Sequence, residues 1–146
     1  MKKPSFYFMA TVLAVGLAAC GNDASDCTMV GQWKVKSADV KSEKLDSLIL
    51  SMSKEMMMLS TYQFTDDSVT INSGGPSGVF SGSYSIDGVN QLLVFKDVIN
   101  NNGNPYMDNM KISSCSGNEV TLLARSPSDT TKQALTTSTI VLEKIK

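Results

Sequence analysis

The chain of 146 residues contains no histidine, and this absence excludes more functions than any other feature of its composition. Without an imidazole there is no histidine base, no Ser/His/Asp or Cys/His catalytic set, and no histidine ligand for a metal. Asp66 and Asp67 are adjacent, so on a strand they would face opposite sides, and backbone turn formation explains them better than paired catalysis. We therefore expect no enzyme, cofactor or metal site.

An excess of positive charge is also absent, with 13 Lys and Arg against 14 Asp and Glu. The formal net charge is -1, which gives the chain no electrostatic means of holding nucleic acid, and we expect no nucleic-acid partner. Long apolar runs are limited to Phe6–Ala19, about 14 residues, too short to span a bilayer. This run follows Lys2 and Lys3, the arrangement of a secretory signal peptide.

The apolar run ends in Leu17-Ala18-Ala19-Cys20, which resembles the lipobox of bacterial lipoproteins. The resemblance implies a signal peptide over residues 1–19, cleavage before Cys20, and acyl chains, palmitate among them, on that cysteine. Residues 20–27 would then form a lipidated tether to the membrane. An ordinary signal peptide with a chance cysteine is the alternative. Gly21 follows the cysteine where inner-membrane retention favours Asp, so we expect a cell-envelope protein of the outer membrane.

The remaining cysteines, Cys27 and Cys115, are an even pair in an oxidising compartment. One disulfide and two free thiols are both open interpretations. A catalytic thiol is not expected, because no histidine is present to activate it.

After residue 28 the chain opens with a predicted strand over Val30–Ser37 and continues with a predicted helix. Ser42 is the expected N-cap of that helix, with Glu43 and Asp46 in its first turn. Apolar residues then recur at helical spacing and predict a face that packs across one end of the fold. Its methionines would fill gaps in the packing or form a flexible lid over a ligand mouth. The residues of this face are Leu45, Leu48, Ile49, Met52, Met56 and Leu59.

From Thr61 onward the apolar residues alternate with polar ones, which is typical of strands, and turn residues separate the runs. Gly82 lies on an inward face, where a missing side chain permits a bend or a close approach. Eight short strands in a meander can close on themselves and leave no edge. We therefore predict an all-β fold with one helix: an eight-stranded antiparallel up-and-down barrel, with the helix between strands 1 and 2. The later strands are expected at 61–65, 69–71, 79–86, 92–95, 106–113, 120–125 and 134–145.

Several motifs resemble those of a lipocalin-like (calycin-type) domain of bacterial lipoproteins. Gly31-x-Trp33 is similar to the lipocalin signature on the first strand, and Thr61–Ile71 is similar to the hairpin of the second and third strands. Gly82–Gly88 and Val141–Ile145 resemble the following strand and the last strand. The resemblance covers most of residues 28–146 and implies that Trp33 seals one end of a barrel. It also suggests that Lys144 lies over the Trp33 ring, the alternative being a solvated lysine.

Two functions remain open for such a barrel. In the first, the interior binds a small apolar ligand; in the second, the interior is filled and the protein acts as a structural or protein-interaction lipoprotein with an unknown partner. Large aromatic and methionine side chains on the predicted strands are the candidate ligand-binding residues, or simply core. These are Tyr62, Phe64, Phe80, Tyr84, Phe95, Tyr106 and Met110.

Overall fold

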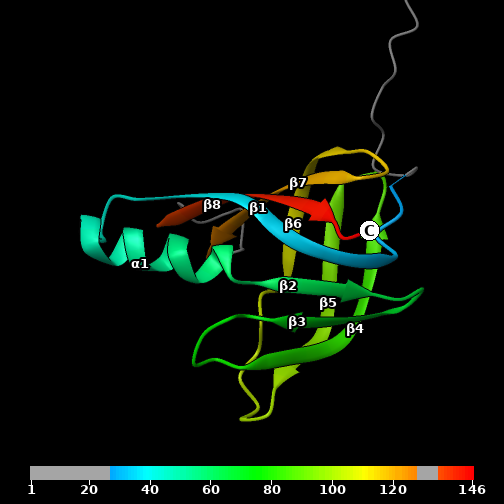
Figure 1. The fold of residues 1–146 in the computed structure, drawn as a ribbon, viewed down its shortest axis with the longest axis horizontal. Coiled ribbons are helices and arrows are strands. Elements are labelled where there is room, and N and C mark those ends of the chain that lie inside the picture. Colours follow the sequence, from blue (N-terminus) through cyan, green and yellow to red (C-terminus); the bar gives the residue numbers. More distant parts are fainter. Residues whose placement is uncertain (1–26, 128–134) are drawn as a thin grey trace, which may run out of the picture.

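The computed structural model describes residues 27–127 and 135–146. In these two ranges the chain forms eight strands and one helix, and the strands close into a barrel in chain order (Figure 1). The predicted fold class, an antiparallel up-and-down barrel with a helix after its first strand, is confirmed. The elements are β1 (Gly31–Ser42), α1 (Ser47–Met58), β2 (Thr61–Phe64), β3 (Ser68–Asn72), β4 (Val79–Asp87), β5 (Leu92–Asn100), β6 (Asn109–Cys115), β7 (Glu119–Ser126) and β8 (Thr136–Lys144).

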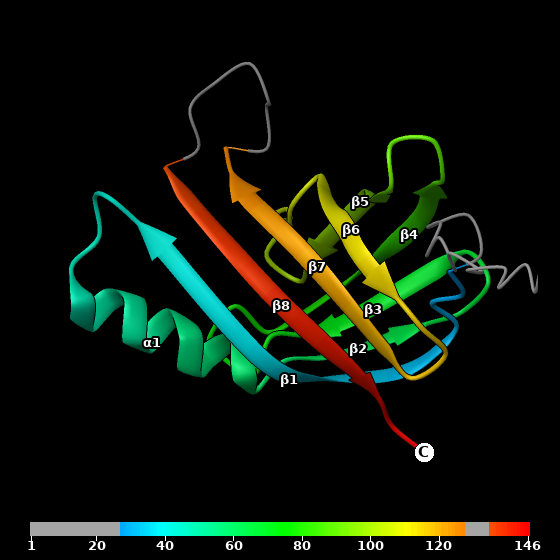
Figure 2. The same cartoon turned by 90° about the horizontal axis from the view of Figure 1, so that it is seen from above.

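The barrel closes through the pairing of β1 with β8. Their register runs from Trp33 opposite Lys144 to Ser42 opposite Thr136, with an irregularity between Val35 and Ser37. We call the end where β1 begins the closed end and the end where β1 finishes the open end. Figures 1 and 2 both show α1 at the open end, on the far side of the molecule from the C-terminus.

Two expectations about the region after Trp33 are wrong. β1 continues to Ser42 rather than ending at Ser37, because Ala38–Ser42 keep their ladder with β8. Ser42 is therefore a strand residue, and its hydroxyl donates to the Leu135 carbonyl oxygen at 2.8 Å. The N-cap of α1 is Asp46, whose carboxylate accepts from the Ile49 backbone N–H at 2.9 Å.

The packing predicted for the helix is also wrong. Leu48, Met52 and Leu59 of the expected packing face are 68%, 55% and 65% exposed, and no residue of α1 is buried. The side chains on the barrel side of the helix are instead half-buried, and they include Leu50 and Met57. The cause is the position of the helix, which lies alongside β1 rather than across the barrel, as Figure 2 shows. Helical periodicity identified an apolar face but not what lies against it.

The closed end is filled by the core. Trp33 is fully buried, and its Nε1–H donates to the Met29 carbonyl oxygen at 2.6 Å. The Lys144 ammonium lies 5.4 Å from the centre of the Trp33 ring, a cation–π arrangement that covers the tryptophan. Gly31 has a φ of 131°, and a Cβ there would lie 2.6 Å from the Lys144 Cε. Glycine at this position therefore lets the lysine reach the ring.

A disulfide joins Cys27 to Cys115, with their Cα atoms 5.7 Å apart. It ties the residues before β1 to the end of β6, at the closed end. The predicted signal peptide over residues 1–19, the lipidation of Cys20 and most of the tether lie outside the described residues. α1, with 12 residues, is shorter than the roughly 20 that span a bilayer, and the described ranges hold no other helix.

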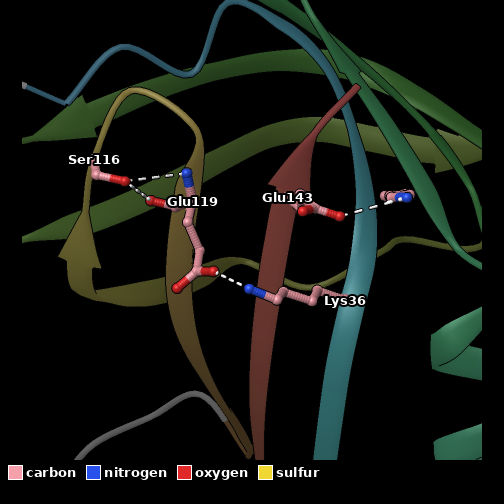
Figure 3. A network of polar contacts seen from close by, with 5 residues as sticks. Lys36, Ser116, Glu119 and Glu143 are labelled. Carbon is pink, nitrogen blue, oxygen red and sulfur yellow. Dashed lines mark hydrogen bonds and ion pairs between the residues drawn. The ribbon is translucent and has the colours of Figure 1, made fainter. Parts of the chain in front are cut away.

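The outer face of β1, β8 and β7 carries ion pairs, which Figure 3 shows from close by. Glu119 and Glu143 lie directly opposite each other across β7 and β8, an unfavourable pairing of like charges. Lys36 lies 2.6 Å from Glu119, and Lys34 lies 3.4 Å from Glu143. The hydrogen bond with Glu119 raises the pKa of Lys36 above its ordinary value. The two lysines therefore compensate a repulsion built into the sheet.

Candidate ligand site at the open end of the barrel

The inward side chains of β7 and β8 are large at the closed end and small at the open end. On β7 the fully buried Val120 and Leu122 are followed by Ala124, and on β8 the fully buried Leu142 and Ile140 are preceded by Ser138. Pairs of these residues face each other in the register, Val120 with Leu142 and Ala124 with Ser138. Large residues thus fill the closed half, and small ones leave space in the open half.

This space forms a cavity of about 550 Å³, which we call the mouth cavity. Its volume lies within the range of small-molecule sites, roughly 300–1,000 Å³. The β7–β8 wall supplies hydroxyl groups, the opposite wall supplies mainly apolar side chains from α1 and from the segment before β6, and Asp108 and Arg125 add charge. The lining residues are Met57, Pro105, Tyr106, Met107, Asp108, Ala124, Arg125, Ser126, Pro127, Thr136 and Ser138.

Tyr106 connects the mouth cavity to the aromatic core. Its ring lies 5.2 Å from that of Phe80 and 5.4 Å, edge to face, from that of Phe95. Its hydroxyl is 3.0 Å from the hydroxyl of Tyr62. The Tyr106 backbone N–H donates to the Val98 carbonyl oxygen at 2.8 Å, which holds the residue against β5 although it precedes β6. The base of the cavity is therefore a fixed aromatic surface.

The two tyrosine hydroxyls at this base stay neutral. Burial raises the pKa of Tyr62, and burial together with the neighbouring Tyr62 raises the pKa of Tyr106 well above its ordinary value. A ligand in the cavity would thus meet neutral phenol and aliphatic hydroxyl groups along with the Asp108 and Arg125 side chains. Such a lining suits a mostly apolar molecule that carries a small polar group.

Of the seven candidate ligand-binding residues, the structure brings Tyr106 to the mouth cavity. Tyr62, Phe64, Phe80, Phe95 and Met110 are buried in the core, at most 7% exposed. Tyr84 is half-buried on β4, and its hydroxyl donates to the Thr65 carbonyl oxygen at 2.7 Å, toward the closed end. Tyr62 additionally borders a separate groove of about 390 Å³ at β2 and β3, whose other lining residues are mostly polar. The large aromatics therefore build the cavity base and the core rather than the cavity wall.

The small residues of the wall were missed as site residues. A small side chain such as Ala124 in a strand pattern does not by itself predict a cavity. The change from the larger Val120 and Leu122 to the small Ala124 and Ser126 is the signal that could have located the open half. In the part of the chain that the structure describes, no cluster of three or more Cys, Asp or Glu side chains is placed to hold a metal ion.

A closed antiparallel barrel of eight strands in chain order, with a helix after the first strand, is an up-and-down barrel, the architecture that lipocalins share. No protein-family model and no curated protein matches the chain. Among solved structures, the chain is similar to a lipocalin-like protein from Bacteroides uniformis ATCC 8492. The two are 18% identical, with a TM-score of 0.44, over 80% of this chain and 97% of that chain. At this similarity no ligand or role transfers to the chain.

Proposed function

We propose that this chain is a lipid-anchored protein of the bacterial cell envelope whose barrel holds a small, mostly apolar ligand in the mouth cavity. The observation that supports ligand binding is the change from large to small inward residues on β7 and β8, which leaves about 550 Å³ at the open end. A barrel of this size can fill its interior with its own side chains, and the closed half does so. The open half does not.

The proposed role is binding and not catalysis. The base of the mouth cavity is aromatic and neutral, and the sequence has no histidine to serve as a base at pH 7. Apolar contacts with Met57, Tyr106 and Met107 would supply most of the affinity. The hydroxyls of Thr136 and Ser138 would orient a polar group of the ligand.

The anchor is proposed from the sequence. The lipobox-like Leu17–Cys20 places the lipid on Cys20, and Gly21 supports the outer membrane as the location. Several acyl chains on one residue exceed the two signals that stable anchoring requires. An intact mass that includes the acyl groups, together with loss of membrane attachment in Cys20→Ala, would test this part.

Ligand binding is tested by filling the cavity. Ser138→Phe together with Ala124→Phe adds two rings at the β7–β8 wall, where space is available, so the fold should be retained. Native mass spectrometry of protein from the envelope fraction, followed by titration with long-chain fatty acids and neutral apolar compounds, should show a bound molecule for the unmodified chain. The double variant should bind it about tenfold more weakly or worse, about 1.4 kcal/mol.

The matched control is Thr137→Phe, since Thr137 is exposed and lies next to Ser138 on β8. Its affinity should equal that of the unmodified chain. If the unmodified barrel takes up none of these compounds, ligand binding is overturned in favour of the structural or protein-interaction role.

A further inference from the structure

The apolar side of α1 is left uncovered by the described part of the chain. We call Leu45, Leu48, Ile49, Met52, Met56 and Leu59 the α1 stripe. Leu48, Ile49, Met52 and Met56 lie on one side of α1 by the 3.6-residue period, and Leu45 and Leu59 flank the two ends of the helix. Each is at least 36% exposed. No charged residue belongs to the stripe. Such a pattern normally faces an apolar environment, which the barrel itself does not provide.

The α1 stripe adjoins the mouth cavity and the β3–β4 connection. Met57, on the barrel side of the same helix, lines the cavity. Near the end of α1, the Ser60 hydroxyl contacts the carbonyl oxygens of Met56 and Ser73, which ties the helix to that connection. A Cβ on Gly75 would lie 2.5 Å from the Met56 methyl group, so the glycine makes room for the methionine. Whatever covers the stripe therefore lies beside the opening of the barrel.

We infer that the α1 stripe rests on the surface of the bilayer to which the protein is anchored, an inference that depends on the proposed lipidation of Cys20. Seven residues, 20–26, separate the lipid from Cys27, and extended they reach about 25 Å. The length of the barrel can be judged from β8, whose nine residues span about 30 Å along the strand. Along the barrel axis the distance is shorter, because barrel strands are tilted. The tether is thus long enough for the barrel to lie on its side with α1 against the same membrane.

The size and charge of the stripe favour lipid over a second copy of the chain. A stable protein interface uses about 20–30 residues from each partner, and the stripe has six. A surface held beside the bilayer by an anchor needs only a weak additional contact, because the tether fixes its effective concentration in the millimolar range. The neighbouring charges carry no positive excess, with Lys44 and Lys54 against Glu43, Asp46 and Glu55, so contact with the bilayer would be apolar and would not require anionic lipid.

This placement gives the mouth cavity a source of ligand. With the stripe in the interfacial region, the opening of the barrel lies beside the bilayer surface, and Met57 lies between the stripe and the cavity on the barrel side of the helix. An apolar molecule could then pass between the bilayer and the cavity without crossing bulk water. The class of ligand inferred for the site is therefore a membrane-resident amphiphile rather than a water-soluble metabolite.

The test places a nitroxide spin label on either side of α1. Met52→Cys puts it in the stripe, and Lys54→Cys, two residues away and also exposed, puts it on another side of the helix as the matched control. In the lipidated chain the three native cysteines are acylated or in a disulfide, so only the new thiol reacts. The labelled proteins are reconstituted in phosphatidylcholine vesicles, and accessibility to oxygen and to a water-soluble nickel complex is measured by power saturation.

At position 52 we expect oxygen accessibility to exceed nickel accessibility several-fold, and at position 54 we expect the reverse. Replacing part of the phosphatidylcholine with phosphatidylglycerol should change neither result. If both positions show the accessibilities of a water-exposed label in protein whose mass includes the acyl groups, membrane docking of the stripe is overturned. The proposed lipid anchor is then unaffected. Spin–spin broadening at position 52 that persists on dilution with lipid assigns the stripe to a second copy and also overturns docking. A chain that never gains the acyl mass overturns the anchor and the docking together.

Discussion

At the scale of single residues, the hydroxyl pair of Tyr62 and Tyr106 is the polar contact on which the base of the mouth cavity depends. The two oxygens are 3.0 Å apart among the rings of Phe80 and Phe95. A buried hydroxyl that loses its partner keeps its desolvation cost, whereas removing both hydroxyls removes that cost as well.

We therefore expect Tyr62→Phe to lower the free energy of unfolding by about 1–3 kcal/mol. The double variant Tyr62→Phe/Tyr106→Phe should lose less than the sum of the two single variants. Urea unfolding of all four proteins of the cycle measures the coupling between the hydroxyls. Additive losses would show that the two tyrosines act independently.

The same pair predicts how stability depends on pH. Burial raises the pKa of both hydroxyls in the folded chain, so the unfolded chain releases these protons first. Their contribution to stability is complete below the unfolded pKa, near pH 10, and is lost as the pH rises through the higher folded values. The free energy of unfolding should accordingly fall more steeply above about pH 10 in the unmodified chain than in the double phenylalanine variant.

At the scale of elements, the β4–β5 pair shows where the barrel tolerates no side chain. The register shifts between Ser81 and Ser83, and Asp97 on β5 has a φ of 51°. A Cβ on Gly82 would lie 2.6 Å from the Asp97 carbonyl oxygen and 2.7 Å from the Val98 Cα, both backbone atoms that cannot move aside. The close approach expected at this glycine is therefore present.

Gly82→Ala should destabilise the barrel by about 1–3 kcal/mol or more, because the strands must separate to admit the methyl group. Ser81→Ala, on the exposed side of the same strand, is the control and should stay within about 0.5 kcal/mol. Thermal unfolding of both variants makes the comparison. Equal melting temperatures would mean that the bulge adapts to the added group.

The strands could be predicted from the sequence because inward and outward residues alternate in a barrel wall. Tyr62 and Phe64, or Val120 and Leu122, carry this pattern directly. The end of β1 could not be predicted, because Ala38–Ser42 have a weak pattern and are held by their partner β8. The orientation of α1 could not be predicted either, since a helical period gives the apolar side and not its neighbour. The cavity was missed because it follows from small residues facing each other across two strands.

At the scale of the whole molecule, the disulfide joins segments 88 residues apart and fixes the residues before β1 to the end of β6. Replacing both Cys27 and Cys115 with serine should lower the free energy of unfolding by about 2–5 kcal/mol. Denaturant unfolding of the variant and of the oxidised chain gives the difference. A change below about 1 kcal/mol would indicate that residual structure already restricts the unfolded chain about as much as the cross-link does.

The barrel is divided between a closed half that supplies stability and an open half that contains space. Trp33, Leu122 and Leu142 are fully buried in the former, and Ala124 and Ser138 line the latter. Substitutions in the closed half should therefore act on folding, and substitutions at the open end should act on what the barrel takes up. This separation makes the cavity-filling variants informative.

The position of Trp33 also determines which events change the intrinsic tryptophan fluorescence of the protein. It is the sole tryptophan, fully buried at the closed end and sealed by Lys144, while the mouth cavity lies at the other end. Its emission should shift to longer wavelengths when the barrel unfolds, yet stay nearly constant when a molecule enters the cavity. Intrinsic tryptophan emission is thus a clean signal of folding, and Tyr106 is the native chromophore beside the ligand.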